Sequence, residues 1–441
     1  MAKVNEIKYH PRIAKFLASV DKRKGNLTDT IVQPSFRMEC INTGSTVLNI
    51  LIGGSRLPDG SFICPGYPKG KIWEIFGRES SGKSTIALTA MGQACALEDG
   101  TGLYIDLEHA VSDSYAMKLG CDFRPPELGG NGRCIRAAPH TAEEVEAMVD
   151  TAALHGISLI VIDSVAGLVS KREHKRDIVD EKDKLGIAEI PRFMANWMPK
   201  LQDIIASTGT CVIFLNQTRD KIGARGYTEE ALKSTTGGNA LKFWASGRWL
   251  LQPKAVSKAK IWNPLLKEHE EVPIATDIMV KNIKNKVDAR QGHSGLITIR
   301  YGVGIDELRT MMNIACAYNI VKHTKNAMKQ DVFEYKSNTS GRIIKAVGIE
   351  KFRRAIQEGE NKEDYSEMMS FCVEKIMQGF RALDDEQLSQ LSEDAVKTMR
   401  SVADDDDDYA EEDSSDPADT KFNVSDDDAT AEGPSIDSSE V

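Results

Sequence analysis

The stretch KIWEIFGRESSGKST, residues 71–85, decides the expected fold. It opens with a short, continuous apolar run at 71–76, which is typical of a buried strand, and continues as a loop of glycine and small polar residues. The loop matches the spacing G-x-x-x-x-G-K-[ST], in which backbone N–H groups and a lysine surround phosphate groups. This motif requires a strand before the loop and a helix after it, and a helix is expected from near Thr85. The stretch therefore predicts an α/β fold with a nucleotide-phosphate site at the end of a strand.

Further apolar runs follow along the chain, separated by segments with helical patterns. Short, continuous apolar runs are typical of strands that are buried on both faces, so the early ones predict a mostly parallel central sheet. The expected strands are residues 71–76, 103–107, 159–162, 211–215, 248–251, 277–280 and 296–300.

The chain of 441 residues divides into four expected parts. Residues 1–37 form an N-terminal oligomerisation arm that is too small to fold alone, so it docks either on its own core or on a neighbouring copy. Residues 38–300 form the α/β core. Residues 301–400 form a small α/β C-terminal domain, and residues 401–441 form a disordered acidic tail.

The tail holds most of the negative charge of the chain. Residues 401–441 contain sixteen Asp or Glu residues and a single lysine, Lys421. Such a composition cannot bury enough apolar surface to become ordered. The whole chain has 56 basic and 66 acidic residues, so the first 400 residues have 55 basic and 50 acidic ones. The folded body is therefore slightly basic.

Composition also excludes some classes of protein. The eight cysteines include no C-x-x-C pair and no regular spacing, which indicates a reduced chain whose thiols serve as small apolar side chains. The N-terminal residues MAKVNEIKYH lack the apolar segment of a secretion signal, and no apolar stretch approaches the roughly 20 residues of a membrane span. We therefore expect a soluble, cytoplasmic protein without a metal cluster.

The loop after the first strand carries the candidate nucleotide ligands. Lys83 is suited to neutralise β- and γ-phosphate charge, and Ser84 to bind Mg²⁺. Asp163 ends the apolar run LIVI at 159–162, and it is suited to hold the Mg²⁺ shell from the same edge of the sheet. The expected ligands of ATP in this loop are Gly77, Arg78, Glu79, Ser80, Ser81, Gly82, Lys83, Ser84 and Thr85.

Two other strand ends supply candidates for catalysis. The run that begins at residue 103 ends in Glu108, a carboxylate suited to orient and deprotonate an attacking water, and Asp106 competes for this role. The run at 211–215 ends in Asn216 and Gln217. The amide of Gln217 is suited to bind a γ-phosphate and to lose that partner after hydrolysis.

Motifs along the chain together resemble the bacterial RecA recombinases, including their phage-encoded relatives. They occur in the order of that family between about residue 43 and residue 358, and TTGGNALKF is far more selective than the phosphate loop. The motifs are GRESSGKST (77–85), YIDLEHAVSDSYAMKLG (104–120), IVIDSVAGL (160–168), FLNQTRDKIG (214–223), STTGGNALKFWAS (234–246), VKNIKNK (280–286) and YGVGIDE (301–307).

The resemblance implies a RecA-type P-loop ATPase core and roles for single residues. Glu108 would be the base for hydrolysis, Tyr115 would stack on adenine, and Gln217 would sense the γ-phosphate. Lys284 and Lys286 would reach the ATP of an adjacent subunit as trans-acting cations.

The resemblance also implies two DNA-binding loops. The first lies near 171–185, where KREHKR is basic. The second is residues 217–239, whose basic, small and apolar side chains suit phosphate contacts and base stacking without reading of base identity. The expected DNA-binding residues are Lys171, Arg172, Lys175, Arg176, Arg192, Arg219, Lys221, Ile222, Arg225, Tyr227, Thr235, Thr236, Gly237, Gly238 and Asn239.

The chain departs from the family pattern at several places. Ala195 and Pro199 stand where the pattern has a serine and an arginine for DNA, so Arg192 alone remains in that helix. Arg78 replaces a proline in the phosphate loop, and an insertion at 61–69 precedes the first strand. Neither change removes a phosphate ligand.

Gln217 ends a strand in the nucleotide site and begins a DNA loop, which predicts reciprocal coupling between ATP and DNA. The expected protein is a DNA-dependent ATPase that assembles head-to-tail through residues 1–37 into a helical filament on single-stranded DNA. It would pair that strand with homologous double-stranded DNA and exchange strands, while the acidic tail competes with DNA for basic surfaces. A ring-shaped helicase with the same core, a small-molecule P-loop kinase and a noncatalytic scaffold protein stay open as alternatives.

Overall fold

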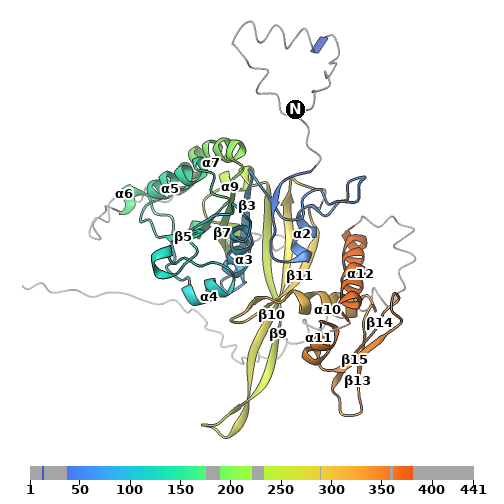
Figure 1. Cartoon of the computed structure of the whole chain (residues 1–441). Coiled ribbons are helices and arrows are strands. Elements are labelled where there is room, and N and C mark those ends of the chain that lie inside the picture. The colour runs from blue at the N-terminus through green and yellow to red at the C-terminus, as the bar shows by residue number, and fades with distance from the viewer. Residues whose placement is uncertain are drawn as a thin grey trace, which may run out of the picture. The chain divides into compact units, whose positions relative to one another are not determined.

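A central sheet of ten strands organises the chain, and Figure 1 shows helices on both of its sides. The structure is a computed structural model, and it describes residues 12–13, 37–174, 189–220, 233–288, 290–357 and 361–380. The strand order is β12-β11-β10-β9-β3-β7-β6-β4-β5, with β8 paired to β7. The acidic tail and nearly all of the expected arm lie outside the described residues.

The parallel half of the sheet contains the strands that the apolar runs predict. Every residue of β3, β4 and β6 is buried, which confirms a sheet covered on both faces. The edge strand β5 was not expected, because the polar Arg136 interrupts its apolar run and two of its residues are exposed. The parallel strands are β5 (Cys134–Ala137), β4 (Gly102–Asp106), β6 (Leu159–Asp163), β7 (Cys211–Asp220), β3 (Ile72–Gly77) and β9 (Gly247–Asn263).

The two faces of this half pack against different helices. Successive side chains of a strand point to opposite faces, so Trp73 of β3 joins the hydrophobic cluster of α2 and α3, whereas Ile72 joins the cluster of α5, α7 and α9. Pro199 lies inside α7 without ending it. The helices are α2 (Thr46–Gly53), α3 (Lys83–Cys95), α5 (Ala142–Leu154), α7 (Glu189–Thr208) and α9 (Ala240–Trp244).

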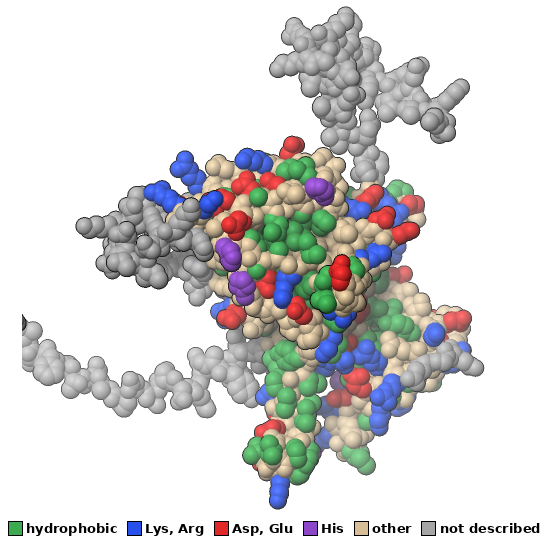
Figure 2. Space-filling model, turned by 60° about the vertical axis from the view of Figure 1, so that its left-hand side comes forward, with side chains coloured by type: hydrophobic (Ala, Val, Ile, Leu, Met, Phe, Trp, Pro, Cys, Tyr) green, Lys and Arg blue, Asp and Glu red, His purple; other side chains and the backbone are tan. Residues whose placement is uncertain are grey.

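The other half of the sheet is antiparallel and contains a long hairpin. Strands β9 and β10 (Glu268–Asn285) pair along their length, and β11 (Ser294–Arg300) and β12 (Gly304–Ile305) follow. The sequence predicted only the inner ends of this hairpin. Its outer part mixes exposed polar and apolar residues, including Trp262 and Leu265, so no continuous apolar run marks it. This part projects from the molecule in Figures 1 and 2.

Residues after Ile305, where β12 ends the central sheet, form a second, smaller sheet with helices. Its antiparallel order is β13-β14-β15. Met311 of α10 and Cys372 of α12 belong to the same hydrophobic cluster as α2 and α3, so this lobe packs on one side of the core. The elements are α10 (Glu307–Ala317), β13 (Lys322–Lys325), β14 (Asp331–Lys336), β15 (Ile343–Val347), α11 (Ile349–Gln357) and α12 (Lys362–Phe380).

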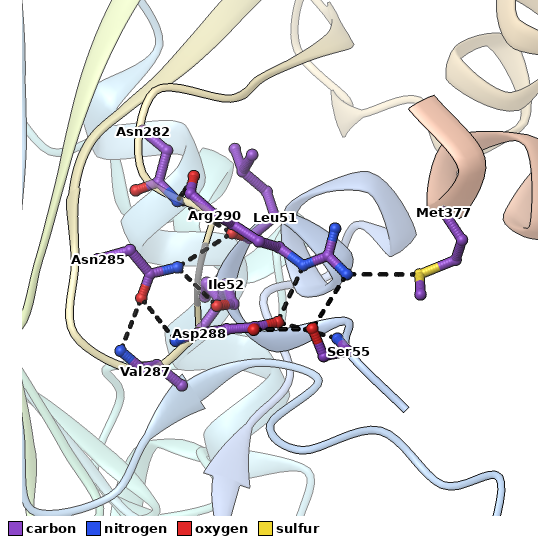
Figure 3. Close-up of polar contacts among 9 residues, drawn as sticks. All are labelled: Leu51, Ile52, Ser55, Asn282, Asn285, Val287, Asp288, Arg290 and Met377. Atoms are coloured by element: carbon purple, nitrogen blue, oxygen red, sulfur yellow. Dashed lines mark hydrogen bonds and ion pairs between the residues drawn. The ribbon is translucent and has the colours of Figure 1, made fainter. Parts of the chain in front are cut away.

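A buried polar cluster fastens the segment after β10 to α12 and to the loop after α2 (Figure 3). Asp288 accepts hydrogen bonds from Ser55 N–H at 2.9 Å and Ser55 Oγ at 2.7 Å, and it pairs with Arg290 at 2.9 Å. The Arg290 guanidinium also lies 3.9 Å from the sulfur of Met377 in α12. Asn285 donates to the carbonyl oxygen of the α2 residue Ile52 at 2.7 Å. The end of β10 is therefore held from two sides.

The cysteines are all free thiols, and six of the eight are buried. They pack as small apolar side chains, for example Cys95 and Cys121 in the cluster that contains α3. Within the described ranges, no helix is both long and apolar enough to cross a membrane.

Candidate functional site

The phosphate loop follows β3 directly, as its motif requires. Ser80 and Gly82 have φ values of +58° and +85°, so the backbone turns through the left-handed region before α3 begins at Lys83. A Cβ atom at Gly82 would lie 2.6 Å from a methyl carbon of Ile299, so the site has no room for a larger residue. The Lys83 ammonium group donates to the Arg78 carbonyl at 2.7 Å, and burial lowers the pKa of Lys83. A cation is thus held where phosphate oxygens would be acceptors.

Oxygen atoms suited to Mg²⁺ meet beside this loop. Ser84 Oγ donates to Asp163 Oδ2 at 2.7 Å, and the Tyr104 hydroxyl donates to the same oxygen at 2.6 Å. Burial raises the pKa of Asp163, while these two hydrogen bonds oppose the shift. Hydroxyl and carboxylate oxygens are hard ligands of the kind that Mg²⁺ prefers, so Ser84 and Asp163 fit the expected ion. Tyr104 was not predicted here, because it lies within the apolar run of β4.

Glu108, just after β4, lies next to Gln217 at the same edge of the sheet. Gln217 Nε2 donates to Glu108 Oε1 at 3.0 Å, and the Ser164 hydroxyl donates to the same oxygen. Asp106, the alternative base, is buried and accepts from two backbone N–H groups of the loop that follows it, at 3.3 and 3.4 Å. Asp106 thus holds its own loop, whereas Glu108 lines the cavity described below.

One cavity of about 610 Å³ brings most of the predicted nucleotide residues together. Its lining includes residues 79–85, Glu108, Tyr115, Asp163 and Gln217. The Tyr115 hydroxyl lies 3.1 Å from Thr85 Oγ1. A strand pattern does not show which strand residues border a ligand, so the sequence did not single out the residues that close the cavity from the antiparallel half: Thr276, Ile278, Ile299, Tyr301 and Gly302.

The two candidate trans-acting lysines lie apart from this cavity. Lys284 Nζ donates to the carbonyl oxygens of Lys242 and Phe243 at 2.5 and 2.9 Å, and Lys286 Nζ lies 3.5 Å from the Phe243 oxygen. Both therefore contact α9, which follows the second candidate DNA loop. The pKa of Lys284 is lowered to about 8, mainly by burial and to a smaller extent by the charges of Lys286 and Arg248.

The region of the first candidate DNA loop is described only at its edges. Lys171 and Arg172 are exposed in the short helix α6 (Lys171–His174), and Arg192 is exposed in α7. Arg172 lies 3.8 Å from Glu189. Lys175 and Arg176 lie outside the described residues.

The second candidate DNA loop has a defined base. Strand β7 continues past Gln217 to Asp220 and pairs with β8 (Lys233–Thr235), so the two ends of the loop lie side by side. Arg219 belongs to β7, and Asn239 immediately precedes α9. Residues 221–232, which include Lys221, Ile222, Arg225 and Tyr227, lie outside the described residues.

The TTGG segment packs closely on its neighbours. Gly237 and Gly238 have φ values of +86° and +73°, and added Cβ atoms would lie 2.9 Å from Val165 and 3.0 Å from Pro191. The hydroxyls of Thr235 and Thr236 are buried and have no hydrogen-bond partner among the residues that the structure describes. The base of the loop therefore has two hydroxyls that no other described residue satisfies.

Comparison with known proteins identifies the family. Residues 12–306 match the family model of the RecA N-terminal domain. The chain is 32% identical over 322 residues to Protein RecA of Mesoplasma florum, with 73% of this chain and 86% of that protein covered. It is 35% identical over 313 residues to Protein RecA of Rickettsia canadensis (70% and 80% covered) and 34% identical over 312 residues to that of Acinetobacter baylyi (69% and 78% covered). The chain belongs to the RecA family.

Proposed function

We propose that the chain is a DNA-dependent ATPase that forms helical filaments on single-stranded DNA and catalyses homologous pairing and strand exchange. Its membership of the RecA family supports this role. The observation that carries the proposal is the position of Gln217, which lines the nucleotide cavity while its strand continues into the candidate DNA loop. Strand β7 therefore connects the nucleotide cavity to the candidate DNA loop.

The side chains of the cavity have the chemistry that ATP hydrolysis needs. Phosphate oxygens would replace the carbonyl acceptors of Lys83, and Mg²⁺, held by Ser84 and Asp163, would neutralise phosphate charge. Glu108 would accept a proton from the attacking water. If Gln217 turns to a γ-phosphate, it gives up its bond to Glu108, so the base loses this donor only when its substrate is present.

The base of the second loop suits a phosphate backbone. An unsatisfied buried hydroxyl costs roughly 1–3 kcal/mol, so Thr235 and Thr236 favour a ligand that brings oxygen acceptors. Contacts to phosphate groups carry no information about base identity. We therefore infer that DNA binding does not depend on sequence, and that pairing specificity comes from the bases themselves.

Among the described strands, β5 has no partner on its outer side, and this edge suits the arm of a neighbouring copy. Strand β5 ends the sheet, Ile135 is 56% exposed, and an open apolar groove of about 780 Å³ lies between β5 and α5. An apolar patch lies on this side of the molecule, which comes forward in Figure 2. Edge strands accept an added strand readily, and the sequence around Ile31 and Val32 is apolar enough to provide one.

This assembly can be tested at Ile135. Ile135→Asp places a charge on the edge that would receive the arm, so we expect head-to-tail assembly to be lost while the separate subunits still bind ATP. Sedimentation velocity and nucleotide titration measure the two properties. Glu144→Gln, at the polar rim of the same groove, is the control and should assemble as the natural chain does.

The central experiment compares ATP hydrolysis with and without single-stranded DNA and then asks whether homologous strands are paired. We expect DNA to stimulate hydrolysis and the protein to pair strands. Hydrolysis that is indifferent to DNA would favour a small-molecule kinase, and unwinding without pairing would favour a ring helicase. Glu108→Gln should abolish hydrolysis but retain nucleotide binding, which separates a catalytic protein from a scaffold.

The role of Gln217 has its own test. Gln217→Ala removes the amide that lies between Glu108 and the DNA loop. We expect a nonhydrolysable nucleotide to tighten DNA binding in the natural chain and to do so much less in the variant. DNA affinity that the nucleotide enhances equally in both proteins would contradict coupling through Gln217.

A further inference from the structure

A line of buried polar side chains crosses the sheet below the candidate DNA loop. Glu74 lies in the middle of β3, between β7 and β9, and is fully buried. Arg248 of β9 donates its Nε–H to one carboxylate oxygen of Glu74, and Asn216 of β7 donates to the other at 3.0 Å. A buried carboxylate is tolerated only when its charge is paired and its oxygens are hydrogen-bonded, and these two neighbours provide both.

Asn216 also bonds to both ends of the loop. Its Nδ2 donates a second hydrogen bond, to the carbonyl oxygen of Thr236 at 2.9 Å, and its Oδ1 accepts from the backbone N–H of Gln217 at 3.0 Å. Gln217 precedes the loop and Thr236 follows it. One fully buried amide group therefore joins the strand that leads into the phosphate loop to both ends of the DNA loop.

The bond to Thr236 is placed where the backbone ladder stops. Strands β7 and β8 pair from Asp220↔Lys233 to Thr218↔Thr235, and Thr236 is the first residue beyond this register. The next two residues are the left-handed glycines of the TTGG segment. Asn216 thus holds the chain at the point where it leaves the ladder and begins the segment with the unused threonine hydroxyls.

We propose that Asn216 is a positioning residue for DNA binding. Through its hydrogen bonds to Glu74 and Thr236, it makes the second end of the DNA loop move together with β3, the strand that leads into the phosphate loop. This inference rests on the proposed function and extends it, because Gln217 by itself controls only the first end. If nucleotide binding shifts β3 relative to β7, Glu74 moves with β3, and the Asn216 amide passes the change to Thr236. ATP then acts on both ends of the loop together.

Asn216→Asp tests this bridge with almost no change in side-chain volume. The new carboxylate keeps an acceptor for the Gln217 N–H, but it cannot donate to Glu74 or to the Thr236 carbonyl. It also faces the charge of Glu74, so the single variant is expected to lose stability as well.

The paired variant Glu74→Gln/Asn216→Asp separates stability from positioning. The new amide at position 74 donates to the new carboxylate at position 216, so the bond between β3 and β7 returns with its direction reversed. One negative charge again lies near Arg248. The Thr236 carbonyl still lacks its donor, because a carboxylate cannot supply one.

The measurement uses the full chain and a fluorescent oligo-dT strand. Affinity is determined with and without a nonhydrolysable ATP analogue and Mg²⁺, and stability is determined by urea unfolding. In both variants, we expect the factor by which the nucleotide tightens DNA binding to fall about tenfold, which is the effect of losing one good hydrogen bond. The urea midpoint should fall in the single variant and return towards that of the natural chain in the paired variant.

The outcomes are distinguishable. If the paired variant recovers its stability but the nucleotide still fails to tighten DNA binding, the loss of coupling comes from the Thr236 bond. This result supports the proposal. A paired variant that recovers both, or a folded single variant that keeps the full nucleotide effect, overturns it while leaving the proposed function standing. If the nucleotide does not tighten DNA binding in the natural chain, the proposed function fails first and this inference falls with it.

Discussion

At the scale of single residues, the site is organised by carboxylate oxygens that already have donors. Asp163 Oδ2 accepts from Ser84 and Tyr104, and Glu108 Oε1 accepts from Gln217 and Ser164. A carboxylate bonded in this way has a fixed orientation. The hydroxyls that orient the two acids therefore belong to the site as much as the acids do.

Tyr104→Phe tests such a hydroxyl, since it removes only the group that bonds to Asp163. We expect the affinity for fluorescent ADP with Mg²⁺ to fall about three- to tenfold, the effect of one hydrogen bond of ~0.5–1.5 kcal/mol, and the affinity without Mg²⁺ to stay the same. Tyr335→Phe is the matched control, because Tyr335 is also buried and bonds to the carboxylate of Glu367 at 2.8 Å, remote from the site. An equal loss in both variants would contradict a specific role.

Lys284 gives the proposed activity a pH dependence on the alkaline side. Burial, then Lys286 and Arg248, lowers the pKa of Lys284 to about 8, while Glu74 opposes this shift. The ammonium charge is therefore present below about pH 8 and is lost as the pH rises. DNA-stimulated hydrolysis, which would need this cation, should fall between roughly pH 7 and 9. In Lys284→Arg the charge persists, so the fall should move to higher pH.

The measurement is the rate of DNA-stimulated ATP hydrolysis as a function of pH, for the natural chain and for Lys284→Arg. The pH at which the rate falls on the alkaline side is compared, not the absolute rate. A fall at the same pH in the natural chain and in Lys284→Arg would show that a group other than Lys284 controls it.

At the scale of helices and strands, the sequence predicted best the elements whose environment is uniform. The runs that became β3, β4 and β6 are buried on both faces, so continuous apolar residues marked them. The outer part of the β9–β10 hairpin carries exposed polar residues, and the edge strand β5 exposes Ile135 and Arg136, so no continuous apolar run marks either. Pairing between backbones, which side-chain patterns do not record, determines these elements.

The same limit applies to the site. The motifs singled out Lys83, Asp163 and Gln217, because the predicted roles fix both residue type and spacing. Tyr104 and Glu74 were missed, because each is a single polar residue inside an apolar strand. Only the fold shows that the first meets Asp163 and that the second meets Asn216. Contacts between strands that are distant in the sequence have no local signature.

The Asp288–Arg290 pair tests how the antiparallel half is anchored (Figure 3). Both side chains are nearly buried, at 6% and 5% exposed, and loss of one partner of a buried ion pair typically costs about 3–5 kcal/mol. We expect Arg290→Met to lower the free energy of unfolding by about this amount in urea titrations. Asp288→Asn/Arg290→Met should recover much of it, because no unpaired charge is then buried. If the paired variant has as low a free energy of unfolding as the single variant, the packing of Arg290, and not its charge, stabilises this region.

At the scale of the whole molecule, the first 400 residues and the C-terminal tail differ in net charge. The first 400 residues have 55 basic and 50 acidic residues, while residues 401–441 have sixteen acidic residues and one lysine. DNA and the tail therefore carry the same sign of charge, and we propose that they compete for the same basic surfaces. Any attraction of the tail to the body is an electrostatic one, which salt screens over about 8–10 Å at physiological ionic strength.

Deletion of residues 404–441 should therefore speed the binding of double-stranded DNA, and the gain should shrink as salt or Mg²⁺ is added. Stopped-flow fluorescence with a labelled duplex measures the association rate across a salt series. The control is a tail of full length in which every Asp and Glu is replaced by Asn or Gln, because it keeps the bulk of the tail and removes its charge. If the neutral tail slows binding as much as the natural one, the tail acts by excluded volume. If the chain with the neutral tail binds as fast as the deletion variant, the tail slows DNA binding through its charge. The association rate will then depend on salt differently for the natural and neutral tails.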